Sequence, residues 1–223
     1  MTYRSMLFNT PMVCAIEDGT KTQTRRLVQL PKNKDWELLG VHPTPDLPGR
    51  LWQAEINGTL TDVKKRFTLG VKAPCVPGDV LWVRETWMQV RHAKPKGNAI
   101  PSDWQEYGFF YYAKDEVANS DGSPVVWRPS IHMPKEAARI FLHVDDVRAE
   151  RLQRMSEDDA MHEGATPEPP FIVGPYVRGF ISTWESTIPK GKILKCGWDA
   201  NPWVWVISFT RMDRPEGWQN VRQ

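Results

Sequence analysis

The chain has 223 residues, of which 40% are hydrophobic and 25% are charged, and 29 Lys and Arg against 27 Asp and Glu leave a formal net charge of +2. This composition excludes a disordered chain, and the charge balance excludes a polycation that binds nucleic acid through bulk charge. No apolar stretch approaches the roughly 20 residues of a membrane-spanning helix, so we expect no membrane partner. The 11 Trp and 19 Pro favour short strands joined by ordered loops over a helical bundle.

The first elements are a helix and a strand. Thr10 as N-cap and Pro11 at the first helical position predict a short helix, which Gly19 ends. Residues 21–28 alternate in polarity and carry β-branched Thr, which is typical of a strand. The residues before this helix lack the continuous apolar core of a secretory signal, which favours a cytoplasmic location.

A loop-rich stretch follows over residues 29–73, with a candidate hairpin whose turn is Asn57-Gly58. Beyond it the predicted strands occupy residues 80–90, 109–112, 140–152 and 202–212, and the third is expected to carry a β-bulge near its Asp pair. Helical segments are predicted over residues 130–139, 156–164 (opened by a capping box) and 176–187. About five or six strands with short helices predict a mixed α+β fold, a small barrel in a single domain over residues 1–223.

Cysteine and histidine spacing predicts neither a disulfide framework nor a metal site. Cys14, Cys75 and Cys196 are odd in number and far apart, which fits reduced thiols in a cytoplasmic protein. Neither a C-x-x-C nor an H-x-x-x-H pair occurs, so we expect no metal and no cofactor.

The segment with the clearest chemical potential is G-T-K-T-Q-T-R-R, residues 19–26. Lys21 lies three residues before Thr24 and could act on its hydroxyl if the cations Arg25 and Arg26 lower the pKa of the amine. The spacing alone favours a simpler alternative, a basic strand that contacts phosphate or solvent.

This segment resembles the opening motif of ASCH-domain proteins, D-G-x-K-T-x-T-R. Further matches follow in the family's order, at Pro77–Leu81, Ile140–Val144, Ser156–Gly164 and Trp203–Arg211. Three Trp-containing segments are similar to the longer phage and prophage members: Trp82–Trp87, Trp127–Pro134 and Trp198–Trp205. The resemblance spans about residues 7 to 211. It implies a small PUA-like β-barrel associated with RNA, with long insertions at about 29–73 and 88–130.

One branch of this family is similar to an amidohydrolase that removes the acetyl group from N4-acetylcytidine. By position, the resemblance implies Lys21 as proton acceptor, Thr24 as nucleophile and Glu163 as proton donor. In such chemistry a base activates the hydroxyl for attack on the acyl carbon, and an acid protonates the departing amine. We therefore expect a hydrolase that acts on an N4-acylated pyrimidine nucleoside or nucleotide. Without the resemblance, Glu163 is an ordinary solvated residue at a helix end.

Five more residues are candidates for substrate contact. Arg26 is a candidate donor to the oxyanion, and Trp87 could stack a nucleobase. Arg84 and Glu85 could line the barrel mouth, or could serve in bracing ion pairs with partners elsewhere in the chain. His132 lies between two prolines that could fix its imidazole, as a ribonuclease would need.

Two alternative functions remain open at this stage. A non-catalytic module that binds RNA or a modified base would use Lys21, Arg25, Arg26 and Arg84 on phosphates. A metal-independent ribonuclease would use Lys21 and His132. In all three cases the expected partner is a nucleoside or RNA.

Overall fold

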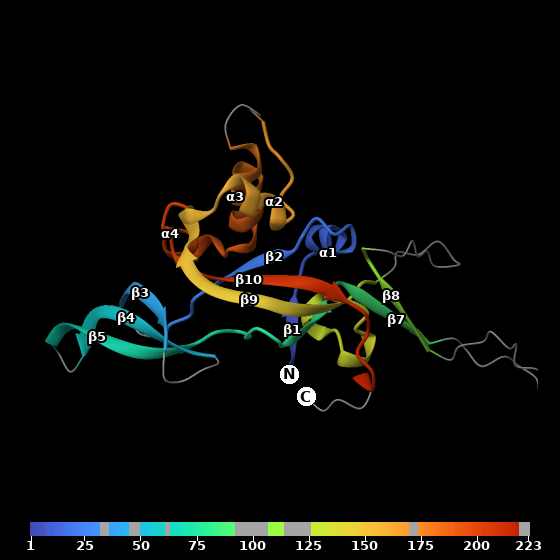
Figure 1. Ribbon diagram of the computed structural model, residues 1–223. Coiled ribbons are helices and arrows are strands. Elements are labelled where there is room, and N and C mark those ends of the chain that lie inside the picture. The colour runs from blue at the N-terminus through green and yellow to red at the C-terminus, as the bar shows by residue number, and fades with distance from the viewer. Residues whose placement is uncertain are drawn as a thin grey trace, which may run out of the picture.

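The computed structural model describes residues 1–31, 36–44, 50–60, 63–91, 107–113, 126–169 and 174–218. These residues form a mixed α+β fold of three sheets with short helices, which confirms the mixed α+β part of the prediction but not the small barrel (Figure 1). The sheets are open: among the described strands no ladder of backbone hydrogen bonds closes a barrel. No helix in these ranges is long and apolar enough to cross a membrane.

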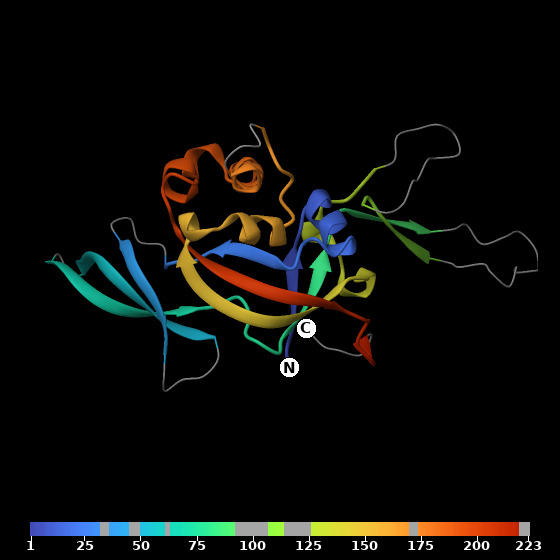
Figure 2. The same cartoon turned by 45° about the horizontal axis from the view of Figure 1, so that its top comes forward.

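The main sheet has five strands in the order β1-β6-β9-β10-β2. The first two strands pair in parallel and the others are antiparallel. The strand bounds are Tyr3–Leu7 for β1, Val80–Arg84 for β6, Phe141–Arg151 for β9, Trp203–Met212 for β10 and Gln23–Leu27 for β2. The long central pair β9 and β10 curves strongly in both views (Figures 1 and 2).

The expected bulge in the 140–152 strand is confirmed. Val144 pairs with Phe209 and Asp146 pairs with Ser208, so Asp145 is the extra residue of β9. A bulge adds bend and twist to a strand, and here it accompanies the curvature of the central pair. On β10, Val204 and Val206 face one core and Trp205 and Ile207 face another, because successive side chains point to opposite faces of a strand.

Two smaller sheets lie at opposite ends of the main sheet (Figure 2). One contains β3 (Glu37–Pro43), β4 (Leu51–Leu60) and β5 (Val63–Lys72), and the other contains β7 (Trp87–Arg91) and β8 (Tyr107–Tyr111). Most of the described residues between 29 and 73 thus lie in strands rather than in loops.

The hairpin within this stretch is present, but the predicted turn was wrong. Asn57 and Gly58 lie inside β4, paired with Arg66 and Lys65. The strand continues because Ala54 and Ile56 are buried in the main core and set the register past the Asn-Gly pair.

The predicted strand over residues 80–90 is in fact two strands, β6 and β7, separated at Glu85. The backbone N–H of Glu85 donates to Met133 Sδ at 3.2 Å, and its carboxylate accepts two hydrogen bonds from Arg139. Because these partners draw Glu85 out of the ladder, β7 pairs with β8 instead of extending the main sheet.

The helices are short. Their bounds are Thr10–Glu17 for α1, Glu157–His162 for α2, Pro175–Thr187 for α3 and Ile193–Cys196 for α4, with single 3₁₀ turns at Ser130–His132, Lys135–Ala137, Leu152–Arg154 and Lys190–Lys192. The N-cap of α1 is Asn9 and not the predicted Thr10, because Asn9 Oδ1 accepts the Met12 N–H at 3.0 Å. The capping box of α2, between Ser156 and Asp159, is confirmed.

The helices α2, α3 and α4 lie together over one face of the central pair, and α1 lies between β1 and β2 in the chain (Figure 1). The two edge strands of the main sheet also approach one another. Arg26 of β2 donates a hydrogen bond to the Leu7 carbonyl of β1 at 2.8 Å, and its guanidinium lies 5.1 Å from the Phe8 ring centroid. We call this approach the seam.

Asp79 anchors β1 to the turn before β6. Its carboxylate accepts hydrogen bonds from the Thr2 and Val76 N–H groups and from Arg4 Nε. Burial alone would raise the pKa of Asp79, but these donors outweigh it and hold the pKa below the ordinary 3.8.

Asp79→Asn is therefore expected to lower the free energy of unfolding by about 1–3 kcal/mol at pH 7, measured by urea denaturation. Because the folded-state pKa is lowered, this contribution is present above pH 3.8 and is lost as the pH falls below it. The difference between the two proteins should shrink in the same range. The control is Asp158→Asn, at an exposed carboxylate, and equal losses in both variants would contradict the anchoring role.

Candidate active site

Lys21 and Glu163 meet at the junction of α1, β2 and α2. The Lys21 N–H donates to the Ala15 carbonyl at 2.9 Å, which turns the chain from α1 toward β2, and Lys21 and Glu163 form an isolated antiparallel bridge. Glu163 is the C-cap of α2 and precedes Gly164, whose φ is +75°. A Cβ at Gly164 would lie 2.7 Å from the Ala15 Cβ, so this close approach requires glycine.

The Lys21 ammonium has all three of its donors occupied. Nζ lies 2.7 Å from Glu163 Oε2, 2.8 Å from the Glu163 carbonyl and 2.8 Å from the Gln23 carbonyl. Lys21 is 2% exposed and Glu163 is 6% exposed. Burial lowers the pKa of Lys21 most strongly; Glu163 opposes this effect, and the nearby Arg26 and Arg25 add to it, so the pKa lies below 10.5.

Arg25 holds the second oxygen of Glu163. Its Nη1 lies 3.2 Å from Glu163 Oε1 and 2.7 Å from Gln23 Oε1, and its Nη2 lies 2.8 Å from Glu150 Oε1. Asp159 is 3.5 Å from the same Nη2. The guanidinium side chain is fully buried, so the carboxylates around it compensate the cost of desolvating its charge.

Thr24 lies next to this network on β2. It is 0% exposed, pairs with Ile207 of β10, and follows Gln23, whose carbonyl accepts a hydrogen bond from Lys21 Nζ. Among the described residues, Thr24 Oγ1 has no hydrogen-bond partner. A buried hydroxyl without a partner costs stability unless a water molecule or a ligand supplies the hydrogen bond, and Arg25 Nε and Arg84 Nε share this state among the described residues.

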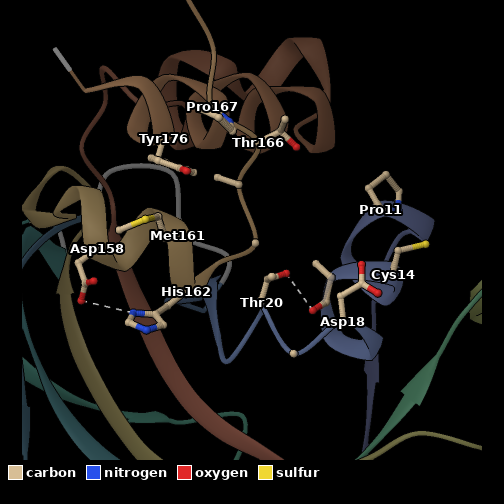
Figure 3. A pocket seen from close by; sticks show the side chains of 14 residues that line it. Pro11, Cys14, Asp18, Thr20, Asp158, Met161, His162, Thr166, Pro167 and Tyr176 are labelled. Atoms are coloured by element: carbon tan, nitrogen blue, oxygen red, sulfur yellow. Dashed lines mark hydrogen bonds and ion pairs between the residues drawn. The ribbon is translucent and has the colours of Figure 1, made fainter. Parts of the chain in front are cut away.

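Two cavities adjoin the site. The first, of about 760 Å³, separates α1 from α2, and three of its lining residues, Thr20, His162 and Gly164, are chain neighbours of Lys21 and Glu163 (Figure 3). The second, of about 410 Å³, lies at the seam, and we call it the seam cavity. Its lining includes Ser5, Leu7, Arg26, Lys72, Arg84 and Trp205.

The structure thus brings four of the predicted site residues together around β2: Lys21, Thr24, Glu163 and Arg26. Arg84 joins Arg26 in the lining of the seam cavity. Glu163 is not the solvated helix-end residue of the simpler interpretation, because it is buried and ion-paired.

The other three predicted contact residues lie elsewhere. Glu85 is buried against Arg139 at 2.9 Å, and Arg139 also contacts Glu17, so Glu85 takes part in a bracing ion pair. Trp87 is buried in a small cluster with Met133, and the Arg128 guanidinium lies 5.4 Å from its ring centroid. His132 is exposed in its 3₁₀ turn and, with Arg84, lines a different cavity.

Sequence reasoning missed the contributions of Arg25 and Glu150. Alternation along β2 places Arg25 with Gln23 on the face opposite Thr24, a signal that was available. Nothing in the sequence links Arg25 to Glu150, which is 125 positions away.

Comparison with protein-family models, with curated proteins and with solved structures found no match for this chain. Within the described ranges, no group of three His, Cys, Asp or Glu side chains is placed to hold a metal ion.

Arg25→Met removes the buried cation. Glu150 then loses its closest cationic partner, and Glu163 loses the partner of its second oxygen. We expect the free energy of unfolding to fall by about 3–5 kcal/mol in urea denaturation. The matched control is Arg148→Met, because Arg148 contacts Glu150 and Asp159 at 3.4 Å but its side chain is 39% exposed. The control should cost about 1 kcal/mol or less. Similar losses in the two variants would show that Arg25 does not hold the site together.

Proposed function

We propose that this protein is a hydrolase that removes the acyl group from an N4-acylated pyrimidine nucleoside or nucleotide, with N4-acetylcytidine as the type substrate. The observation that carries the proposal is the unpartnered, buried hydroxyl of Thr24, which follows Gln23, the residue whose carbonyl accepts a hydrogen bond from the buried, Glu163-paired Lys21. These are the nucleophile, base and acid that acyl transfer requires. Their residue types match the positions implied by the ASCH resemblance, and membership of that family is part of the proposal.

The PUA-like barrel belongs to the same proposal. The five-stranded sheet curves, its two edge strands approach at the seam, and Arg26 connects them through a side-chain hydrogen bond to Leu7. Side chains of β1, β6, β9 and β10 share one buried core on the concave side of this arrangement. These features support an incompletely closed barrel in which the seam takes the place of the missing ladder.

The first chemical step sets the protonation states. Lys21 acts as a base only as a neutral amine, and the proton it gives up has an acceptor 2.7 Å away in Glu163 Oε2. Transfer along this hydrogen bond yields a neutral amine and a carboxylic acid, which are the base and the acid that the reaction needs. Burial lowers the pKa of Lys21 and so favours its neutral form. Arg25 on Oε1 leaves Oε2 as the oxygen that carries the proton.

In the second step Thr24 Oγ1 attacks the acyl carbon and its proton passes to Lys21 Nζ. The tetrahedral intermediate collapses when Glu163 donates its proton to the exocyclic nitrogen, so the C–N bond breaks and the free amine of the pyrimidine leaves. A water molecule then hydrolyses the Thr24 ester, which releases the carboxylic acid and restores the hydroxyl. Arg26, two positions from Thr24 and on the same face of β2, is the candidate donor to the developing oxyanion.

Substrate reaches Thr24 only when a covering side chain moves, because Thr24 and Lys21 are 0% and 2% exposed. Arg26 is suited to this role. It lines the seam cavity, and among the described residues its hydrogen bonds go only to the backbone carbonyls of Arg25 and Leu7.

The two alternative functions have less support. A ribonuclease that uses Lys21 and His132 would need both at one cavity, whereas the Lys21 amine is enclosed with Glu163 and His132 is exposed in a separate turn. A pure binding module gains support from Arg26 and Arg84 in one cavity, but it leaves the unpartnered Thr24 hydroxyl without a purpose.

The sharpest test is Thr24→Val, which replaces the hydroxyl by a methyl group of the same shape. Because Oγ1 makes no hydrogen bond in the described structure, the variant should keep or gain stability while turnover of N4-acetylcytidine, followed by ultraviolet absorbance, is lost. Thr24→Ser, which keeps the hydroxyl, should retain measurable turnover. A Thr24→Val protein that is folded and fully active would overturn the proposal.

The pH profile tests the base. Activity requires the pair with one proton, as neutral Lys21 and protonated Glu163, so kcat/KM for N4-acetylcytidine should fall as the pH rises and that last proton is lost, and this falling limb should lie below 10.5 because the pKa of Lys21 is lowered. The apparent pKa read from this limb describes the coupled Lys21–Glu163 pair and not Lys21 alone. Arg26→Gln removes a cation that lowers this pKa, so the limb should move to higher pH, whatever happens to the maximal rate. Arg148→Gln is the control that should not move it, and an unmoved limb in Arg26→Gln would contradict Lys21 as the base.

A further inference from the structure

The seam cavity is strongly electropositive. Arg26 from β2, Lys72 from the end of β5 and Arg84 from the end of β6 all line it, and its lining contains no Asp or Glu among the residues that the structure describes. Three cations from three strands of two sheets thus face about 410 Å³ of space.

None of these three cations has a close ion-pair partner among the residues that the structure describes. In the described part of the chain, none of the three lies within 4.0 Å of a carboxylate oxygen: Arg26 donates to the Arg25 and Leu7 carbonyls, and Arg84 donates to the Ile131 carbonyl. Arg84 Nε is buried and has no hydrogen-bond partner within the described ranges. Five other arginines have carboxylate partners, namely Arg4, Arg25, Arg66, Arg139 and Arg148, whereas Arg50 and Arg151 also donate to backbone carbonyls.

Like charges that converge on one cavity repel each other, and an anion bound between them would relieve the repulsion. A phosphate group suits the donors present, because guanidinium groups bind its oxygens through paired N–H donors and an ammonium adds a point charge. Ser5 and Gln29 add polar side chains to the same lining.

We propose that the seam cavity binds the phosphate group of the substrate. The substrate class is then an N4-acylated pyrimidine nucleotide, either free or within a nucleic-acid chain, rather than a nucleoside. This inference rests on the proposed function. Arg26 and Thr24 are two positions apart on one face of β2, and such residues are roughly 6.6 Å apart along a strand. A phosphate bound in the seam cavity would therefore lie close to the stretch of β2 that carries Thr24.

The experiment is calorimetric titration of the intact protein with inorganic phosphate, cytidine 5′-monophosphate and cytidine, at pH 7.5 and low salt. We expect the monophosphate to bind more tightly than cytidine. Lys72→Ala and Arg84→Ala should each weaken monophosphate binding by about tenfold, because each removes a charged hydrogen-bond donor. The matched control is Lys65→Ala, also exposed on β5 but seven positions from Lys72 and so on the opposite face, and it should leave the affinity unchanged.

A second arm separates the two sources of phosphate. A short single-stranded oligonucleotide without terminal phosphates is titrated in parallel. If the oligonucleotide binds and the monophosphate does not, and if Lys72→Ala weakens oligonucleotide binding by about the same factor, the site takes a phosphodiester of a nucleic-acid chain. The inference is overturned if neither ligand binds, or if Lys72→Ala and Arg84→Ala bind as Lys65→Ala does. Because these titrations need no turnover, failure of the hydrolase proposal would show separately, in the Thr24 variants.

Discussion

The hydrogen-bonded pair of Lys21 and Glu163 is the interaction on which the candidate site depends. It joins the start of β2 to the end of α2 across 142 positions of sequence, in an interior from which water is nearly excluded. Two charges in such a place are costly unless each has partners, and removal of either leaves the other uncompensated. Arg25 supplies the second partner of Glu163 and in turn requires Glu150 and Asp159. The charge balance of the interior therefore fixes how α2 sits on the edge of the sheet.

Two short segments supply nearly all of this arrangement. The cations come from one segment, in which Lys21 lies just before β2 and Arg25 lies within it. The carboxylates Glu150, Asp159 and Glu163 come from the end of β9 and from α2 with its C-cap. The curvature of β9 and β10 brings the two segments together (Figure 2). Several long-range contacts join the two segments, among them the ion pairs of Lys21 with Glu163 and of Arg25 with Glu150.

Charge is distributed differently on the two sides of β2. On the side of α2, each cation has a carboxylate partner and the network is closed. At the seam, Arg26, Lys72 and Arg84 face a cavity whose described lining has no carboxylate. Thr24 belongs to the strand between them, with its hydroxyl unsatisfied. A closed network suits a group that must hold its geometry, whereas unpaired cations suit a group that binds and releases an anion.

Strong local patterns were enough to predict much of the fold. Three predictions that rest on about ten residues of local sequence each are confirmed: the apolar strand β10, the capping box of α2 and the bulge in β9. The pairing of β1 with β6 was missed, because a five-residue strand with mixed polarity carries no such pattern. The turn at Asn57-Gly58 was wrong because burial of Ile56 outweighs the local turn preference.

The candidate site was predictable only in part and for a different reason. Lys21, Thr24 and Glu163 were selected through resemblance to a family, and periodicity gave no indication that Glu163 would reach Lys21. The role of Arg25 was hidden because its carboxylate partners lie 125 to 138 positions away, and ion pairs at that separation leave no regular spacing in a single sequence. Exposure was also beyond prediction, since Glu85 and Trp87 are polar or aromatic but serve in buried contacts.

The central claim is that the Thr24 hydroxyl accepts the acyl group, and a single-turnover reaction tests it most directly. The protein in excess over N4-acetylcytidine is quenched with acid at intervals, digested and analysed by mass spectrometry. The account predicts that an acetyl group appears on the peptide that contains Thr24 as cytidine forms, and disappears as acetate is released. Cytidine and acetate that form together at every time point, with the acetyl group found on another residue or on none, would contradict it.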